Sequence, residues 1–80
     1  MRLDKFLKVS RIIKRRTVAA EFADSGRVMI NGRVAKPSAA VKVGDIITLS
    51  SAGKETRYEV LDIRENVRVN EAGELYRLLT

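Results

Sequence analysis

Apolar and basic residues alternate along the first sixteen positions at the spacing of an amphipathic helix. We expect this helix to run from about Leu3 to Ile13. Residues three and four apart share a helix face, so Leu3, Phe6 and Leu7 form the side that packs. The opposite side is basic at every third position, and the last of these positions begins a basic triplet at 14–16: Arg2, Lys5, Lys8, Arg11, Lys14, Arg15 and Arg16. The pattern predicts a helix with one buried face and one cationic face.

A second helix is predicted from Thr17 to about Ser25. Thr17 can cap its first turn, and Gly26 can adopt the left-handed conformation that ends helices. The residues expected to face the core are Val18, Ala19, Phe22 and Ala23. Unpaired N–H groups and a partial positive charge lie at a helix start. Together with the basic triplet before it, this start predicts a phosphate-binding corner.

The pattern then changes from helical to extended. Two pairs of strands are expected, at residues 28–30 with 33–35 and at residues 46–50 with 56–63. Asn31-Gly32 favours a tight hairpin turn in the first pair, because both turn positions need positive φ. The second pair turns across residues 51–54. The tail from Asn66 to Thr80 is ambiguous, and we expect a last strand or short helix there to pack on the core through Leu75, Tyr76, Leu78 and Leu79.

These elements predict an α+β fold in which two N-terminal helices pack on a small, mostly antiparallel sheet of about four to five strands. A chain of 80 residues is normally one domain with little enclosed volume. We therefore expect residues 1–80 to form a single domain.

Composition excludes most enzyme chemistry. The chain has no cysteine and no histidine, which rules out disulfides, thiolate nucleophiles, His-containing triads and sites with Cys or His metal ligands. No glycine-rich phosphate loop occurs. We expect a binding module with no catalysis, cofactor, metal or small-molecule substrate. The charges interleaved along the first sixteen residues and the short apolar runs predict neither a secretion signal nor a membrane partner.

Charge is concentrated in the first half of the chain. Residues 1–42 contain eleven Lys/Arg and three Asp/Glu, whereas residues 43–80 contain five and seven. This asymmetry predicts a surface that binds nucleic acid. Lys36 and Lys42 either widen that surface or are ordinary surface lysines. Both phenylalanines occupy core-facing positions, so the chain lacks the aromatic platform that binds single strands and is better suited to structured RNA.

Several segments occur in the order and spacing of one family: Arg2-Leu3-Asp4-Lys5-Phe6-Leu7, Lys14-Arg15-Arg16-Thr17, Gly26-Arg27-Val28, Val34-Ala35-Lys36-Pro37-Ser38 and Val43-Gly44-Asp45. Over about residues 1–50 the chain resembles the RNA-binding domain named after small-subunit ribosomal protein four, the S-four domain. The opening segment is similar to the heat-shock-protein-fifteen subfamily. Its short length and Leu75-Tyr76 tail resemble the RqcP-like members of that subfamily.

The resemblance implies a cytoplasmic, non-enzymatic factor whose two helices form an αL-type RNA-binding motif. Its expected partners are the ribosomal RNA (rRNA) of the large ribosomal subunit, tRNA and an RqcH-like factor. Its expected role lies in ribosome-associated quality control of stalled chains, where it would stabilise P-site peptidyl-tRNA during alanine tailing. The core motif would span residues 1–50, with a strand pair and tail at 51–80. The positions that match the family's RNA-contacting residues are Arg2, Asp4 and Arg16.

The candidate RNA-binding residues are Arg2, Lys5, Lys8, Arg11, Lys14, Arg15, Arg16, Thr17 and Lys36. Asp4 is unexpected on a surface that binds phosphate, and we expect it to orient its neighbours. It could cap the first helix, or pair with an arginine such as Arg16 and fix the guanidinium for bidentate phosphate contact. It could also simply favour the helix dipole.

Three other interpretations remain open. The chain could be the RNA-targeting subunit of a separate RNA-modifying or tRNA enzyme. Its first helix could lie on a membrane surface, which would require the apolar side of that helix to leave the core. It could also bind DNA, although Glu21 and Asp24 on the second helix disfavour contact with a major groove.

Overall fold

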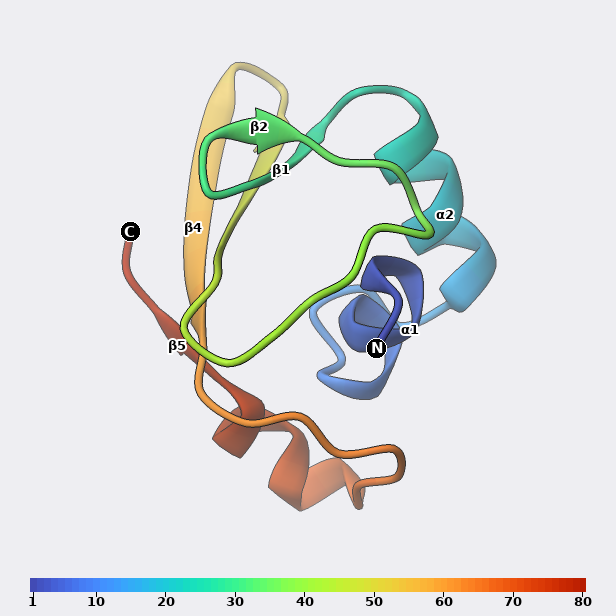
Figure 1. The fold of residues 1–80 in the computed structure, drawn as a ribbon, viewed down its shortest axis with the longest axis vertical. Helices are drawn as coiled ribbons and strands as arrows, with labels where there is room; N and C mark the ends of the chain where they lie inside the picture. Colours follow the sequence, from blue (N-terminus) through green and yellow to red (C-terminus); the bar gives the residue numbers. More distant parts are fainter.

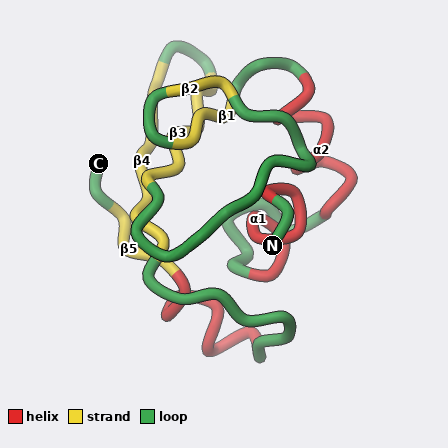
Figure 2. Tube along the Cα trace, viewed as in Figure 1, coloured by secondary structure: helices red, strands yellow, loops and turns green.

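The computed structural model describes residues 1–80 as two short α-helices beside a five-stranded sheet, with a 3₁₀ helix near the C-terminus (Figures 1 and 2). The elements are α1 (Leu3–Val9), α2 (Arg16–Asp24), β1 (Val28–Ile30), β2 (Arg33–Val34), β3 (Ile46–Ser51), β4 (Lys54–Val60), η1 (Val69–Leu75) and β5 (Tyr76–Leu78). The strand order is β2-β1-β3-β4-β5, and every neighbouring pair is antiparallel. The predicted α+β fold is confirmed.

Two tight turns organise the sheet. Asn31 and Gly32 have φ values of 52° and 82°, so the hairpin between β1 and β2 is confirmed. Ala52 and Gly53 form a similar turn, with φ values of 52° and 76°. This turn occupies only two residues, so β4 begins at Lys54, two residues before the predicted start. The prediction that β4 reaches residue 63 is also wrong, because the N–H groups of residues 61 and 62 both donate to the carbonyl of residue 75 instead of continuing the sheet.

The apolar side of α1 lies in the core. Leu3, Phe6 and Leu7 are fully buried, as predicted, and belong to one cluster with residues of α2 and the sheet. This burial disfavours the interpretation of α1 as a membrane-surface helix, because its apolar side is already covered by protein. None of the helices has the length and apolar character needed to cross a membrane.

The first helix is shorter than predicted: α1 ends at Val9, not at Ile13. The Ser10 hydroxyl donates to the carbonyl of Leu7, and the N–H of Ile13 reaches the same carbonyl at 3.0 Å. Between them, Arg11 adopts φ 60°, in the left-handed region that helices cannot continue through. This turn directs Ile13 back onto the core, where it is partly buried.

The second helix begins one residue earlier than predicted, at Arg16, and Arg15 is its N-cap. No side chain caps this helix, so the predicted capping role of Thr17 is wrong. The early start places Thr17 inside the first turn and exposed. Ala19 and Ala23 form the buried side of α2, and Val18 lies about 100° around the helix from Ala19. Val18 is therefore 44% exposed, contrary to the prediction that it faces the core.

The tail contains both a short helix and a strand. Leu75, at the end of η1, is fully buried, as expected. Tyr76 is partly buried and meets the ring of Tyr58 edge to face, with ring centres 5.3 Å apart. Leu78 and Leu79 are exposed, so the prediction that they pack on the core is wrong. Leu78 is the last residue of the edge strand β5 and Leu79 lies beyond it, so both lie at the periphery of the sheet.

The N-terminus is paired with the long connection between β2 and β3. The N–H of Val41 donates to the carbonyl of Met1 at 2.8 Å, and Arg2 forms a β-bridge with Ala40. The N–H of Asp4 then donates to the carbonyl of Pro37 at 3.1 Å. This pairing fixes the start of α1 and brings the chain next to Pro37, including Lys36, close to it.

Candidate nucleic-acid interface

The cationic face predicted for the first helix exists, and it extends beyond α1 along the connection to α2. Lys5 is partly exposed, and the other predicted cations of this region are exposed: Arg2, Lys8, Arg11, Lys14, Arg15 and Arg16. Acidic side chains are few here. Lys8 and Arg11 form no ion pair within the protein, which leaves their charges uncompensated.

Asp4 links two of these cations in a group that we call the Asp4 cluster, consisting of Arg2, Asp4 and Arg16. Arg2 donates two hydrogen bonds to the carboxylate, from Nε and from Nη2, each 3.2 Å long. Arg16 donates one, from Nη2 at 3.3 Å, and thus keeps more of its N–H groups free than Arg2 does. The N–H of Lys5 also donates to Asp4, at 2.8 Å. The predicted pairing of Asp4 with an arginine is confirmed.

The position of Asp4 determines its charge state. Only 4% of its surface is exposed, and burial alone would raise its pKa. The hydrogen bond from Arg2 and the positive charges of Arg16 and Arg2 outweigh that effect and lower the pKa below its usual value. Asp4 therefore stays ionised and holds the two arginines in place, while about half of each arginine side chain remains exposed.

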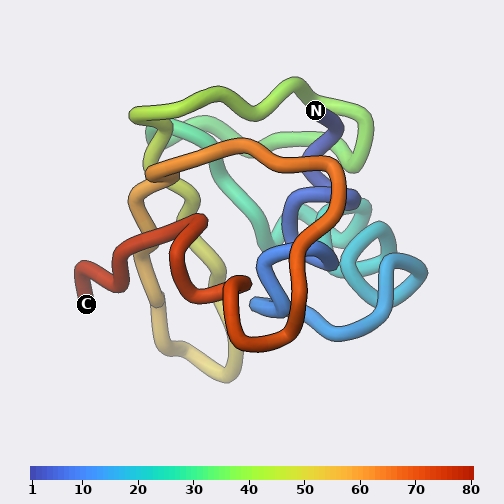
Figure 3. The backbone as a smooth tube through the Cα atoms, turned by 90° about the horizontal axis from the view of Figure 1, so that it is seen from below, coloured from blue at the N-terminus to red at the C-terminus, as the bar shows by residue number.

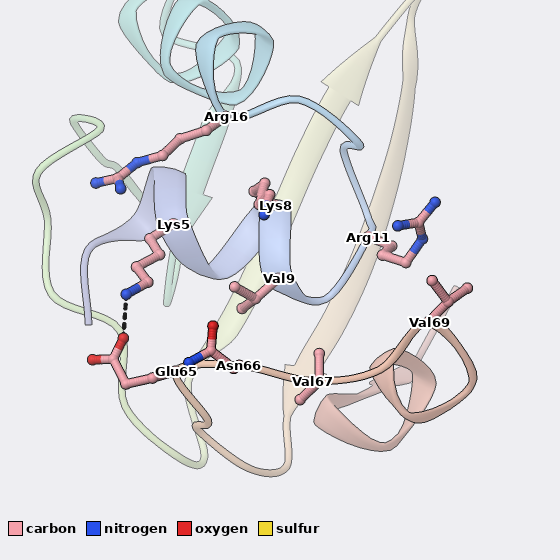
Figure 4. A pocket seen from close by; sticks show the side chains of 9 residues that line it. All are labelled: Lys5, Lys8, Val9, Arg11, Arg16, Glu65, Asn66, Val67 and Val69. Carbon is pink, nitrogen blue, oxygen red and sulfur yellow. Dashed lines mark hydrogen bonds and ion pairs between the residues drawn. The ribbon is translucent and has the colours of Figure 1, made fainter.

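A groove runs along the cationic face of α1 (Figure 4). Its volume is about 210 Å³, and its lining consists of Lys5, Lys8, Val9, Arg11, Arg16, Glu65, Asn66, Val67 and Val69. We call it the basic groove. Its upper wall comes from α1 and the α1–α2 region, and its lower wall is the segment 65–69, which passes beside α1 (Figure 3). Glu65 closes one end through an ion pair with Lys5, which lowers the pKa of Glu65, first through the hydrogen bond and then through the lysine charge.

The structure brings some predicted residues together and leaves others apart. Lys5, Lys8, Arg11 and Arg16 line the basic groove. Lys36 adjoins the start of α1, beside the Asp4 cluster, through the backbone pairing of Pro37. Arg2 lies outside the groove within the Asp4 cluster, and the remaining candidates are also exposed outside the groove: Lys14, Arg15 and Thr17.

The lower wall of the groove was not predicted from the sequence. Residues 66–69 lie in the ambiguous tail, and no helical or strand periodicity marks them. Contacts between separate parts of the chain hold this segment: Glu65 pairs with Lys5, Arg64 pairs with Glu74, and the N–H of Leu61 donates to the carbonyl of Leu75. The signal that could have found it was the short apolar pair Val67 and Val69 within a polar stretch.

No aromatic side chain lines the groove. Phe6 is fully buried, and Phe22 lies under the guanidinium of Arg27, 5.6 Å from the ring centre. Tyr58 and Tyr76 meet on the sheet, where burial, and then the neighbouring Tyr76, raise the pKa of Tyr58. The interface therefore offers charge and shape but no stacking platform for successive bases.

The variants Arg11→Gly and Arg11→Ala separate the effect of the Arg11 charge on RNA binding from the effect of this residue on folding. Glycine at this left-handed position should raise the free energy of unfolding by about 0.5–1 kcal/mol relative to Arg11→Ala, because glycine adopts positive φ without steric cost. If Arg11 contacts phosphate, both variants should lose equal RNA affinity. Urea unfolding and RNA titration of the two variants check this. A higher RNA affinity of the more stable glycine variant would contradict this, because both variants lack the same charge.

The sequence comparisons agree on one family. The family model described as the S4 domain matches residues 1–47. A Bacillus subtilis protein named RQC P-site tRNA stabilizing factor is 49% identical over 79 residues, which cover 99% of this chain and 92% of that protein. The protein of the same name from Halalkalibacterium halodurans is also 49% identical, over 98% of this chain and 89% of its own length.

A solved structure extends the agreement to the fold. Heat shock protein 15 of Vibrio cholerae superimposes with a TM-score of 0.89 at 38% identity, covering 99% of this chain and 81% of that one. The likeness therefore includes the tail from which the lower wall of the groove is built. The family match over residues 1–47, the close relatives and the shared fold confirm the resemblance that the motifs indicated, and the chain belongs to the S4 domain family.

Proposed function

We propose that this protein is a non-enzymatic RNA-binding factor of ribosome-associated quality control. It binds the rRNA of the large ribosomal subunit and tRNA in the cytoplasm, and it stabilises P-site peptidyl-tRNA while an RqcH-like factor adds alanine to the stalled chain. Residues 1–80 act as one RNA-binding domain. The printed name of the relatives, RQC P-site tRNA stabilizing factor, supports this role.

The observation that carries the proposal is the Asp4 cluster beside the basic groove. A buried carboxylate holds Arg2 and Arg16 at the surface with N–H groups still free. Arginines that are already ordered lose less conformational entropy when they bind phosphate. Lys5, Lys8, Arg11, Lys14, Arg15 and Lys36 then contact neighbouring phosphates, and these contacts favour the shape of folded RNA over any one sequence.

The test is capture of the tagged protein from cells in mild salt, followed by identification of the RNAs and ribosomal particles bound to it. We expect large subunits that carry tRNA, and we expect Arg16→Ala to lose them. The matched control is Lys54→Ala, which removes one exposed lysine at the β3–β4 turn, at the opposite end of the sheet from α1 (Figure 1). Recovery of an RNA-modifying enzyme without ribosomes, or of DNA, would contradict the proposal.

Salt dependence measures the electrostatic part of binding. If about five phosphates are neutralised, a plot of log affinity against log salt should have a slope of about −3.5 to −4.5, depending on the form of the RNA. Titration of a labelled RNA hairpin at several salt concentrations gives this slope. A flat response would exclude phosphate contacts as the main source of affinity.

Glu65 should weaken RNA binding, because its carboxylate occupies Lys5 and adds negative charge to the basic groove. Glu65→Gln should therefore raise RNA affinity about two- to fivefold at moderate salt and make the salt slope steeper by about 0.7–0.9. Glu55→Gln, on β4, removes the same charge outside the groove and should change affinity less. Equal gains in RNA affinity for the two variants would mean that affinity depends on net charge and not on the position of Glu65 in the groove.

A further inference from the structure

Three residues of the lower groove wall are uncharged. Asn66, Val67 and Val69 carry no positive charge, yet they face the cations of α1 across the groove (Figure 4). Val69 is 70% exposed, so packing within the fold does not account for a large apolar side chain at this place. Asn66 is also exposed, and its amide points toward Val9 in the groove.

Charge within the groove is uneven along its length. At one end Glu65 pairs with Lys5, and a phosphate there would meet a carboxylate. At the other end Lys8 and Arg11 have no acidic partner, and Val69 lies beside Arg11 (Figure 4). A phosphate is therefore favoured at the end formed by Lys8 and Arg11.

The middle of the groove has a different chemistry. Val67, which is partly buried, and the exposed Val69 supply apolar surface that can contact the face of a base or a ribose, as apolar side chains do in pockets for extruded bases. The Asn66 amide has both donors and an acceptor, which is the complement of a base edge. The volume of about 210 Å³ is below the roughly 300–1,000 Å³ of typical small-molecule pockets, which suits a single base.

A base within an RNA duplex cannot reach such a place. Its edge lies in a deep, narrow major groove or a shallow minor groove, and its faces are stacked. We propose that the basic groove receives one unpaired nucleotide of the bound RNA, with its phosphate at Lys8 and Arg11, its base against Val67 and Val69, and its edge at Asn66. This inference rests on the proposed RNA-binding function and adds base contact to it.

The experiment compares three labelled RNA hairpins: one fully paired, one with a single bulged adenosine, and one with an abasic residue in the bulge. The protein should bind the adenosine bulge about five- to tenfold more tightly than the other two, which is the lower end of the range for a base stacked on an aromatic ring, because valine offers a smaller surface. The abasic hairpin has the flexible bulge without the base. It therefore separates base contact from RNA deformability.

Two surface variants locate the contact. Asn66→Ala and Val69→Ser should each reduce the preference for the adenosine bulge and leave affinity for the paired hairpin unchanged. Both residues are exposed, so the fold should tolerate these changes. Lys14→Ala, outside the groove, should weaken binding to all three hairpins equally and preserve the preference.

The outcomes separate this inference from the proposed function. Tight binding of all three hairpins without a preference, or a preference that both variants retain, would overturn the groove assignment alone. Weak, salt-independent binding of every hairpin would overturn the RNA-binding function itself. Displacement of the adenosine bulge by an acidic peptide, with loss of that competition in Asn66→Ala and Val69→Ser, would assign the groove to a protein partner instead.

Discussion

Replacing Arg16 with alanine should lower affinity for structured RNA about 10- to 100-fold, the largest effect expected from any single cation of the interface. Hydrogen bonds that involve a charged group contribute about 1.5–3 kcal/mol each. Arg16 lines the basic groove, and its single hydrogen bond to Asp4 orients the guanidinium while leaving other N–H groups for phosphate. Titration of a labelled RNA hairpin at fixed salt measures the loss.

Two comparisons show whether the contribution of Arg16 to RNA affinity comes from the geometry of its guanidinium or from its charge alone. Arg16→Lys keeps the charge but loses the planar fork, so it should recover only part of the affinity. Arg2→Ala should cost less RNA affinity than Arg16→Ala, because Arg2 already commits two donors to Asp4. Thermal melting would confirm that each variant is folded. Full recovery by Arg16→Lys would reduce the role of Arg16 to a point charge.

Replacing Asp4 with asparagine should affect both folding and binding. The carboxylate accepts hydrogen bonds from Arg2, Arg16 and the N–H of Lys5, and the neutral amide cannot replace them all. We expect the free energy of unfolding at neutral pH to fall by about 2 kcal/mol, which lowers Tm by about 10 °C in a domain of this size. RNA affinity should also fall even though the net charge becomes more positive, because both arginines lose their anchor.

The lowered pKa of Asp4 also makes the free energy of unfolding depend on pH in the acidic range. The pKa of Asp4 is lower in the folded protein than its usual value of 3.8 in the unfolded chain. Its contribution is therefore fully present above pH 3.8, and it is lost as the pH falls toward the lower pKa of the folded state. Urea unfolding at pH 7 and pH 3 should show this loss in the native protein and a smaller one in Asp4→Asn. An identical loss in both would assign the acid sensitivity to other carboxylates.

Local signals predicted most of the fold. The burial of Leu3, Phe6 and Leu7 follows from helical spacing, and the turn at Asn31-Gly32 follows from the need for positive φ. The end of α1 could not be predicted in the same way. Arginine rarely adopts the left-handed conformation, and at Arg11 it is accompanied by the packing of Ile13 on the core and by the hydrogen bond from the N–H of Ile13 to the carbonyl of Leu7.

The candidate site also has one part that local sequence patterns predict and one part that they do not. The cations of α1 and the pairing of Asp4 with Arg16 could be predicted, because regular spacing and a lone acid among bases are visible in the sequence. The lower wall of the basic groove could not. Its position depends on hydrogen bonds from the N–H groups of residues 61 and 62 to the carbonyl of residue 75, and on the ion pair of Lys5 with Glu65, sixty residues apart in the chain.

The pairing of the N-terminus determines where a label can be attached. Met1 accepts a hydrogen bond from Val41, and Arg2 is bridged to Ala40, directly before the Asp4 cluster. A fusion at Met1 would place a foreign segment against this bridge and beside the arginines. Thr80 is exposed beyond the edge strand β5, on the far side of the molecule from α1 (Figure 1). An affinity handle or fluorophore therefore belongs after Thr80, where it leaves the cationic face open.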